Sequence, residues 1–189
     1  MKVKKKRKAY KILGVDPGTI AMGFSILEVD GTVLKVQDMG IIHLQKFETH
    51  QEKLKEIYLQ LQEIIETYLP SCMAVEAPFY GKNVQSMLKL GRAQGVAMAA
   101  AITMGLEITE YSPKKIKKSI TGNGNATKES VAAMLSSMLD FSYESKLKDA
   151  TDALAAAVTH YHQSKLGVSS AKGSNSWKSF VNNNPSRVK

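Results

Sequence analysis

Residues 10–44 read YKILGVDPGTIAMGFSILEVDGTVLKVQDMGIIHL, and this stretch decides the fold. Its first apolar run, 10–16, ends in Asp-Pro-Gly, which predicts a strand followed by a turn, because proline fixes one backbone dihedral and glycine frees the next. Strand-like runs also cover 22–29 and 32–44, and the Asp30-Gly31 pair between them is typical of a hairpin. We therefore expect an antiparallel meander of three strands at the start of the chain.

Helices and strands alternate after this meander. Apolar residues recur at intervals of three and four over 48–69, which predicts an amphipathic helix. The remaining elements are expected as strands at 72–76 and 106–111 and helices at 83–104, 112–120, 127–139 and 148–164. This order predicts an α/β protein with a mixed sheet and helices on both of its faces.

The composition limits the size and class of the protein. With 189 residues, 43% of them hydrophobic, the chain holds one domain with a real core. The longest stretch without charge has 14 residues, between Arg92 and Glu107, and a membrane span needs roughly 20. No apolar signal core follows the basic start, so we expect a cytoplasmic protein. The single cysteine, Cys72, excludes an intrachain disulfide and is expected to be a small buried hydrophobe.

The net charge of +9 is concentrated in the two ends of the chain. We divide the chain into a basic arm at 1–9, a domain at 10–165 and a flexible basic tail at 166–189. Basic tails attract a polyanion such as nucleic acid, but they also serve as solubility devices. Within the domain, segment 81–130 has eight bases against three acids, which is the more specific indication of nucleic-acid binding.

Four acids stand at the ends of predicted apolar elements, where a carboxylate has no role in packing: Asp16, Glu76, Asp149 and Asp152. Asp149 and Asp152 are three apart and so project to one side of their helix. Clustered carboxylates repel one another unless cations separate them, and Mg²⁺ prefers oxygen ligands. Two such ions about 4 Å apart can clamp a phosphodiester for hydrolysis. Each acid also has an ordinary alternative, as a turn residue or a helix-dipole partner.

Four motifs carry a resemblance to a known family: Gly14-Val15-Asp16-Pro17-Gly18, Val75-Glu76-Ala77-Pro78-Phe79, the segment 83–95 (NVQSMLKLGRAQG) and the segment 149–155 (DATDALA) with Thr159-His160. In this order, over residues 10–162, the chain resembles the RuvC family of bacterial Holliday-junction resolvases. The resemblance implies a ribonuclease H-like fold and a Mg²⁺-dependent endonuclease that acts as a homodimer. It further implies paired, symmetric nicks in four-way DNA junctions during recombination and repair, and cooperation with the RuvA and RuvB branch-migration complex.

The resemblance also implies roles for individual residues. The four acidic metal ligands of the family match Asp16, Glu76, Asp149 and Asp152. Some relatives have histidine at the position of Asp149, so the role of this residue is the least fixed. The DNA-contacting residues of the family match Phe79, Lys117 and Lys128. The basic extension at the end of the chain is a departure from the family pattern.

The residues themselves give partial support to these DNA contacts. Phe79 follows Pro78 in a loop beside Glu76, where its ring would either wedge between bases or fill the core. Lys128 begins a predicted helix, and a helix N-terminus with a lysine favours a phosphate. Lys117 belongs to a lysine-rich run that is otherwise read as a solvated helix face.

Small residues form a stripe of Gly91, Gly95 and Ala99 on the helix 83–104. This stripe either packs on the sheet of its own chain or forms a subunit interface. The four histidines show no metal spacing and are expected to be structural. His160 lies eleven residues after Asp149, roughly 16 Å along a helix, too far to share its ion.

Two other classes of protein compete with the nuclease interpretation. A Gly-x-Asp-x-Gly turn also occurs in actin-like and sugar-kinase ATPases, which need two such domains, whereas this chain has room for one. A junction-binding module without catalysis would be expected to lack one or more of the four acids.

Overall fold

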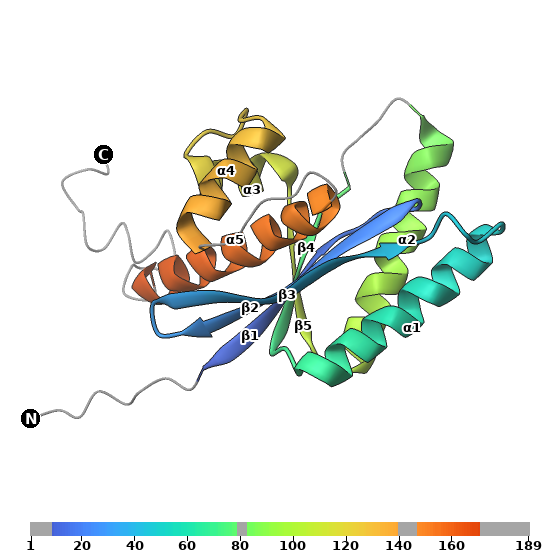
Figure 1. The fold of residues 1–189 in the computed structure, drawn as a ribbon, viewed down its shortest axis with the longest axis horizontal. Coiled ribbons are helices and arrows are strands. Elements are labelled where there is room, and N and C mark those ends of the chain that lie inside the picture. The colour runs from blue at the N-terminus through green and yellow to red at the C-terminus, as the bar shows by residue number, and fades with distance from the viewer. Residues whose placement is uncertain (1–8, 79–82, 140–146, 171–189) are drawn as a thin grey trace, which may run out of the picture.

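A single five-stranded sheet forms the centre of the computed structural model, which describes residues 9–78, 83–139 and 147–170 (Figure 1). The strand order is β3-β2-β1-β4-β5. Strands β1, β2 and β3 pair antiparallel, while β4 runs parallel to β1 and β5 parallel to β4. The strands are β1 (Tyr10–Asp16), β2 (Ala21–Asp30), β3 (Val33–His43), β4 (Cys72–Glu76) and β5 (Glu107–Tyr111). The expected meander and mixed sheet are confirmed.

Turn and helix-capping residues set the boundaries of several of these elements. Gly31 has a φ of 63° at the turn between β2 and β3, a conformation that suits glycine. Thr49 and Glu52 form a capping box at the start of α1, and Leu69 ends this helix in the left-handed conformation. The helices are α1 (His50–Tyr68), α2 (Val84–Thr103), α3 (Pro113–Thr121), α4 (Lys128–Leu139) and α5 (Lys148–Ser170).

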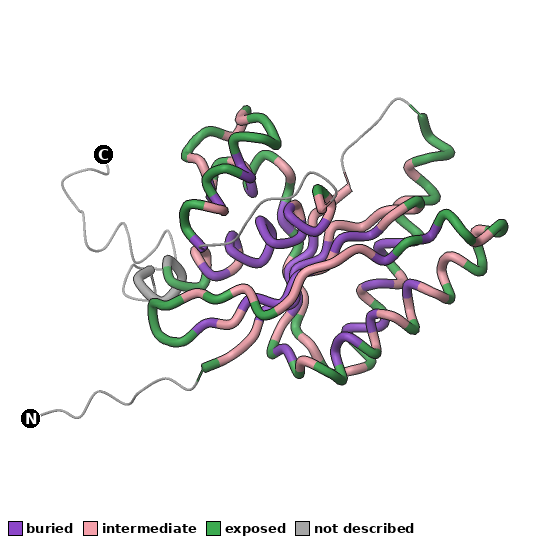
Figure 2. The backbone as a smooth tube through the Cα atoms, viewed as in Figure 1, coloured by how far each residue is buried: buried purple, intermediate pink, exposed green. Residues whose placement is uncertain are grey.

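The helices cover both faces of the sheet, as the sequence predicted (Figure 1). Alternate residues of β1 point to opposite faces. Leu13 and Val15 pack in a core with α1 and α2, whereas Ile12 packs in a second core with α3, α4 and α5. In Figure 2 the buried residues lie along the central strands and along α5. Because Asp16 follows this alternation, it belongs to the face that α5 covers.

Helix α5 lies unusually close to the sheet because glycines stand beneath it. A Cβ on Gly14 would lie 2.1 Å from the carbonyl oxygen of Ala153, and a Cβ on Gly23 would lie 1.9 Å from that of Asp149. The helix itself presents small side chains, Ala150, Ala153, Ala156 and Ala157, all fully buried. The backbone of α5 therefore rests directly on β1 and β2, and this contact fixes the height of Asp149 above the sheet.

The ends of the chain are described only in part. Helix α5 continues to Ser170, so its last residues lie inside the segment 166–189 that was expected to be a flexible tail. Most of the expected arm at 1–9, and the tail from 171 onward, lie outside the described residues. Among the described residues, no helix combines the length and apolar character that a membrane crossing requires.

The glycine contact generates a test of the fold. Gly23→Ala should lower the free energy of unfolding by about 1–3 kcal/mol, because the new methyl group overlaps the backbone of Asp149 and α5 must move. The control is Gly91→Ala, where nothing lies within 4 Å of the added Cβ. This substitution within a helix should instead raise the free energy of unfolding by up to about 1 kcal/mol. Urea denaturation of both variants makes the measurement, and equal stability of the two would contradict the close approach of α5.

Candidate active site

Three of the four predicted acids meet at one end of the sheet. Asp16 is the last residue of β1, and Asp149 and Asp152 lie in the first turns of α5. One carboxylate oxygen from each of these residues lies within 4.8 Å of the others. Asp149 and Asp152 follow Asp16 by 133 and 136 positions in the sequence, and the contact of α5 with the glycines of β1 and β2 brings them to it.

Glu76 lies beside this cluster without belonging to its tightest group. It ends β4, which pairs in parallel with β1 so that Val75 lies opposite Val15. The carboxyl ends of parallel strands meet at one edge of the sheet, so Glu76 and Asp16 emerge there as neighbours. The effect of Glu76 on the pKa of Asp16 reflects this proximity.

Burial and repulsion from neighbouring carboxylates favour the protonated forms of Asp16 and Glu76. Burial, and then the charges of Glu76, Asp152 and Asp149, raise the pKa of Asp16 to about 8, although Lys128 opposes the change. Burial and the charge of Asp152 raise the pKa of Glu76 to about 7. Four ionised carboxylates at this end of the sheet therefore need positive charge beside them. Carboxylate oxygens at this spacing suit a hard divalent cation such as Mg²⁺.

Lys128 supplies one positive charge to the acids. It begins α4, where the hydroxyl of Thr127 accepts a hydrogen bond of 3.2 Å from the backbone amide of Ser130. The ammonium group of Lys128 donates a hydrogen bond to the carboxylate of Asp152 and forms an ion pair with it. Burial alone would lower the pKa of Lys128, but this bond and the neighbouring carboxylates raise it. The lysine is therefore part of the acidic site, whereas the sequence indicated only a phosphate contact.

A groove of about 500 Å³ opens beside these acids. Both acidic and basic side chains line it, together with the Gly-Asn loop before α4. The charged residues that line it are Glu76, Asp152, Lys114, Lys117 and Lys128. The charge of Lys117 lowers the pKa of Glu76, against the effect of burial. The groove therefore joins a candidate metal site to cations that can hold a phosphate backbone.

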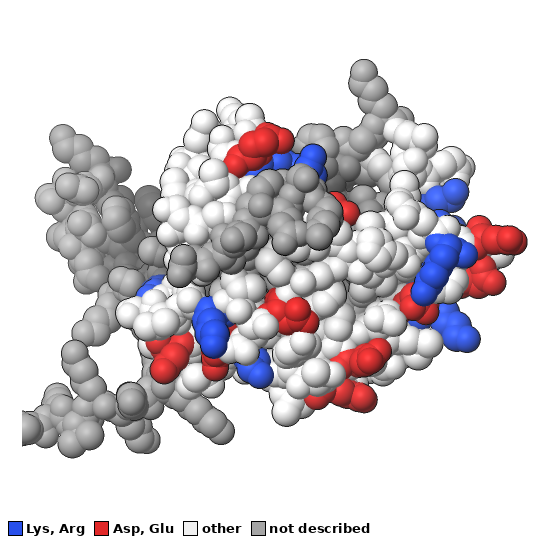
Figure 3. All heavy atoms as spheres, in the orientation of Figure 1, with Lys and Arg blue, Asp and Glu red and all other residues white. Residues whose placement is uncertain are grey.

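The basic segment 81–130 does not form one patch. Lys114, Lys117 and Lys128 line the groove, while Lys115 and Lys118 line a separate hollow with α5. Lys89 lies elsewhere, in a cavity beside α1. On the face drawn in Figure 3, acidic and basic side chains are interspersed. The lysines that lie close together in the sequence of α3 therefore face two different surfaces of the protein.

The other predicted site residues have different outcomes. Phe79 lies outside the described residues. His160 stands apart from the acids: its Nε2 is 3.5 Å from the sulfur of Cys72, and its Nδ1 is 3.0 Å from the hydroxyl of Tyr111. Cys72 is partly buried, and burial raises the pKa of its thiol to about 11. Both residues therefore have the structural surroundings that the sequence predicted.

Known proteins are similar to this chain in sequence over most of its length. The family described as crossover junction endodeoxyribonuclease RuvC matches residues 12–160. The chain is 56% identical over 178 residues to the protein of that name from Cytophaga hutchinsonii, covering 94% of this chain and 88% of the relative. It is 53% identical over 182 residues to the one from Porphyromonas gingivalis, covering 94% and 96%.

Solved structures extend the similarity to the fold. Thermus thermophilus RuvC superposes with a TM-score of 0.76 at 27% identity, covering 83% of this chain and 96% of that one. The same protein in complex with Holliday junction substrate gives a TM-score of 0.78 at 27% identity, covering 84% and 96%. The described fold is therefore ribonuclease H-like, as expected.

The raised pKa values predict how stability depends on pH in the presence of a chelator. The pKa of Asp16 rises from 3.8 to about 8 on folding, so the folded protein binds more protons than the unfolded chain between these values. The free energy of unfolding of the wild type should therefore fall as pH rises from 5 to 8. Asp16→Asn should flatten this fall and be the more stable protein at pH 8. Urea denaturation at each pH makes the measurement.

The control for this prediction is Asp30→Asn, which changes an exposed acid at the end of β2. It should keep the slope of the wild type. If Asp16→Asn keeps that slope too, the cluster does not hold protons as described.

Proposed function

This chain belongs to the RuvC family of crossover junction endodeoxyribonucleases, and we propose that its acidic cluster is the catalytic centre with which it cuts four-way DNA junctions. The enzyme resolves Holliday junctions by paired, symmetric nicks. The observation that supports the site assignment is the convergence of Asp16, Asp149 and Asp152 within 4.8 Å, at the mouth of a groove that carries lysines. A junction-binding module without catalysis would have no need of this buried charge.

The proposed metal ligands are Asp16, Glu76, Asp149 and Asp152, and the proposed ions are two Mg²⁺. The donor set fits, because all four side chains offer carboxylate oxygens, and burial makes the charges of Asp16 and Glu76 costly without a cation. Divalent ions bound there would activate water and stabilise the charge that develops on the phosphate. Lys128 already neutralises part of the same charge through Asp152, and it also lines the groove.

The proposed DNA contacts are Lys117, Lys128 and Phe79. Lys117 and Lys128 line the groove from α3 and α4, so a strand placed in the groove would have cations along its backbone. Lys128 would exchange its bond with Asp152 for one with phosphate when other cations neutralise that carboxylate. The assignment of Phe79 as a wedge between bases at the junction centre follows from the family motif.

A homodimer is proposed because two symmetric cuts need two catalytic centres. Gly91, Gly95 and Ala99 are exposed, and nothing in the described structure lies within 4 Å of a Cβ at either glycine. Internal packing of this stripe, one of the two alternatives, is therefore wrong: Ala93, Ala97 and Ala100 face the core instead. The same exposed side of α2 carries large apolar side chains, Val84, Leu88 and Ile102, with exposed fractions of 66%, 52% and 61%. Such a surface suits a second copy of the helix.

Two further proposals rest on the family and the substrate. Cooperation with the RuvA and RuvB branch-migration complex follows from membership of the RuvC family. A cytoplasmic place of action follows from a chromosomal DNA substrate.

The catalytic proposal separates chemistry from binding. Asp16→Asn should lower the rate of junction cleavage in Mg²⁺ by more than about 100-fold, because the loss of even a residue that only supports a metal ligand costs 10–100-fold. Junction affinity in a chelator should stay within about threefold, since phosphate contacts lie elsewhere in the groove. Gel-shift and nicking assays on a synthetic four-way junction measure the two quantities.

Lys117→Ala is the complementary variant for these assays. It should weaken binding and lower the slope of log affinity against log salt by about one unit. Lys118→Ala is the control on the same helix, because Lys118 lies outside the groove.

An Asp16→Asn enzyme that cuts at the wild-type rate would contradict the catalytic proposal and remove Asp16 from the metal site.

The dimer proposal is tested at Gly95. Gly95→Leu adds a bulky side chain to an open surface, so the fold should survive with an unchanged or higher melting temperature. The association of two copies through α2 should be blocked by overlap, giving a monomer that makes single nicks. Analytical sedimentation at micromolar concentration measures the mass of both proteins. A wild-type monomer that makes paired cuts, or a Gly95→Leu dimer, would contradict the proposed interface.

A further inference from the structure

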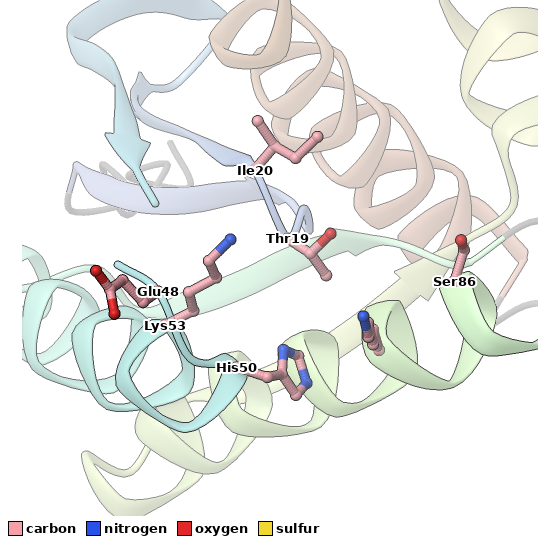
Figure 4. Close-up of a pocket in the computed structure, with 7 residues that line it drawn as sticks. Thr19, Ile20, Glu48, His50, Lys53 and Ser86 are labelled. Atoms are coloured by element: carbon pink, nitrogen blue, oxygen red, sulfur yellow. The ribbon is translucent and has the colours of Figure 1, made fainter. Parts of the chain in front are cut away.

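A second cavity lies on the face of the sheet opposite the acidic groove, where α1 and α2 cover it. It has a volume of about 300 Å³ and is bounded by the β1–β2 turn, the start of α1 and the first turns of α2 (Figure 4). Its lining residues are Thr19, Ile20, Glu48, His50, Lys53, Ser86 and Lys89. None of them belongs to the catalytic centre proposed above.

The cavity is surrounded by cations that lack ion-pair partners. After burial, the charges of Arg92, Lys89 and Lys53 lower the pKa of His50, so all three lie close to this ring. In the described part of the chain none of these cations forms an ion pair, since the ion pair present there joins Lys128 to Asp152. Glu48 is the acid among the lining residues, and in Figure 4 its carboxylate points away from Thr19 and Ser86.

His50 adds an unsatisfied polar atom to this cluster. Its Nε2 is closed off from solvent and has no hydrogen-bond partner among the described residues. Such an atom is costly unless a ligand satisfies it. The groups nearby, two hydroxyls and the ammonium groups of Lys53 and Lys89, are hydrogen-bond donors. A cavity rich in donors and positive charge is complementary to an anion that accepts several hydrogen bonds.

The position of Lys53 also favours an anion in this cavity. Lys53 lies in the first turn of α1, where the helix dipole disfavours a cation. Glu52 compensates in part, but it is engaged in the capping box with Thr49. In Figure 4 the Lys53 side chain extends toward Thr19, across the cavity. An anion between these groups would relieve the repulsion among the cations and complete the positive end of the helix.

We propose that this cavity binds a phosphate of the substrate DNA backbone, next to the strand that is cut. This inference rests on the proposed function. The β1–β2 turn connects the two sites: Thr19 follows Asp16 by three residues, so a strand that leaves the acidic centre over this turn reaches the cavity. Lys53, Lys89 and His50 hold the phosphate, and Thr19 and Ser86 donate hydrogen bonds to it. The site positions the strand and takes no part in bond cleavage.

The test is a salt titration of junction binding in a chelator, where no cleavage occurs. The double variant Lys53→Gln/Lys89→Gln should lower the slope of log affinity against log salt by about one unit, as expected for one lost phosphate contact. The control Lys35→Gln/Lys55→Gln removes the same charge from exposed positions outside the cavity and should keep the wild-type slope. A cavity variant with the same slope as this control would overturn the proposal.

A second measurement separates backbone phosphate from free phosphate. The imidazole signals of His50, followed by NMR, should shift when junction is added and also when inorganic phosphate is added, and phosphate should weaken junction binding more than chloride at equal ionic strength. A shift caused by phosphate without this competition would assign the cavity to a free anion and overturn the DNA assignment. Failure of the proposed function looks different, because wild type would then leave junctions uncut in Mg²⁺ whatever the salt slope.

Discussion

The contact between the backbone of α5 and the glycines beneath it is the constraint on which the site depends. The backbone of α5 leaves no room for a Cβ at Gly14 or Gly23, and α5 packs on the sheet through small, buried alanine side chains. Because interiors are close-packed, a methyl group here would lift α5 from the sheet. The carboxylates of Asp149 and Asp152 would rise with it and leave Asp16. The small residues are therefore as necessary to the geometry of the proposed catalytic centre as the acids are.

This close packing also creates the electrostatic character of the centre. Burial raises the pKa values of Asp16 and Glu76 more than any single neighbouring charge does. The folded protein thus holds carboxyl groups in surroundings where they ionise fully only beside cations. Lys128 provides one such charge, and the groove around it can admit others together with a phosphate backbone. In the proposed centre, divalent ions would offset the energetic cost of burying these acids.

The sheet separates two sites that both contain lysines. The groove near Lys117 lies on the face covered by α3, α4 and α5, and the cavity around His50 lies on the face covered by α1 and α2. The turn after Asp16 joins them at the same edge. A strand that crosses this edge would be held on both sides of the scissile bond, which is how positioning contributes to phosphodiester cleavage without further chemistry.

The sequence by itself determined the element order, the meander and the four acids, because period-two and period-3.6 patterns, the Asp30-Gly31 turn and acids at element ends are local signals. Tertiary structure alone decided which groups meet. No local pattern showed that Gly23 lies against Asp149, that Lys128 pairs with Asp152, or that His50, treated as structural, lines a cavity with Lys53 and Lys89. Nor did the stripe of Gly91 and Gly95 reveal which way it faces, since helical spacing gives a shared face but not its direction. These outcomes depend on how helices dock on the sheet, and docking is a property of surfaces far apart in the chain.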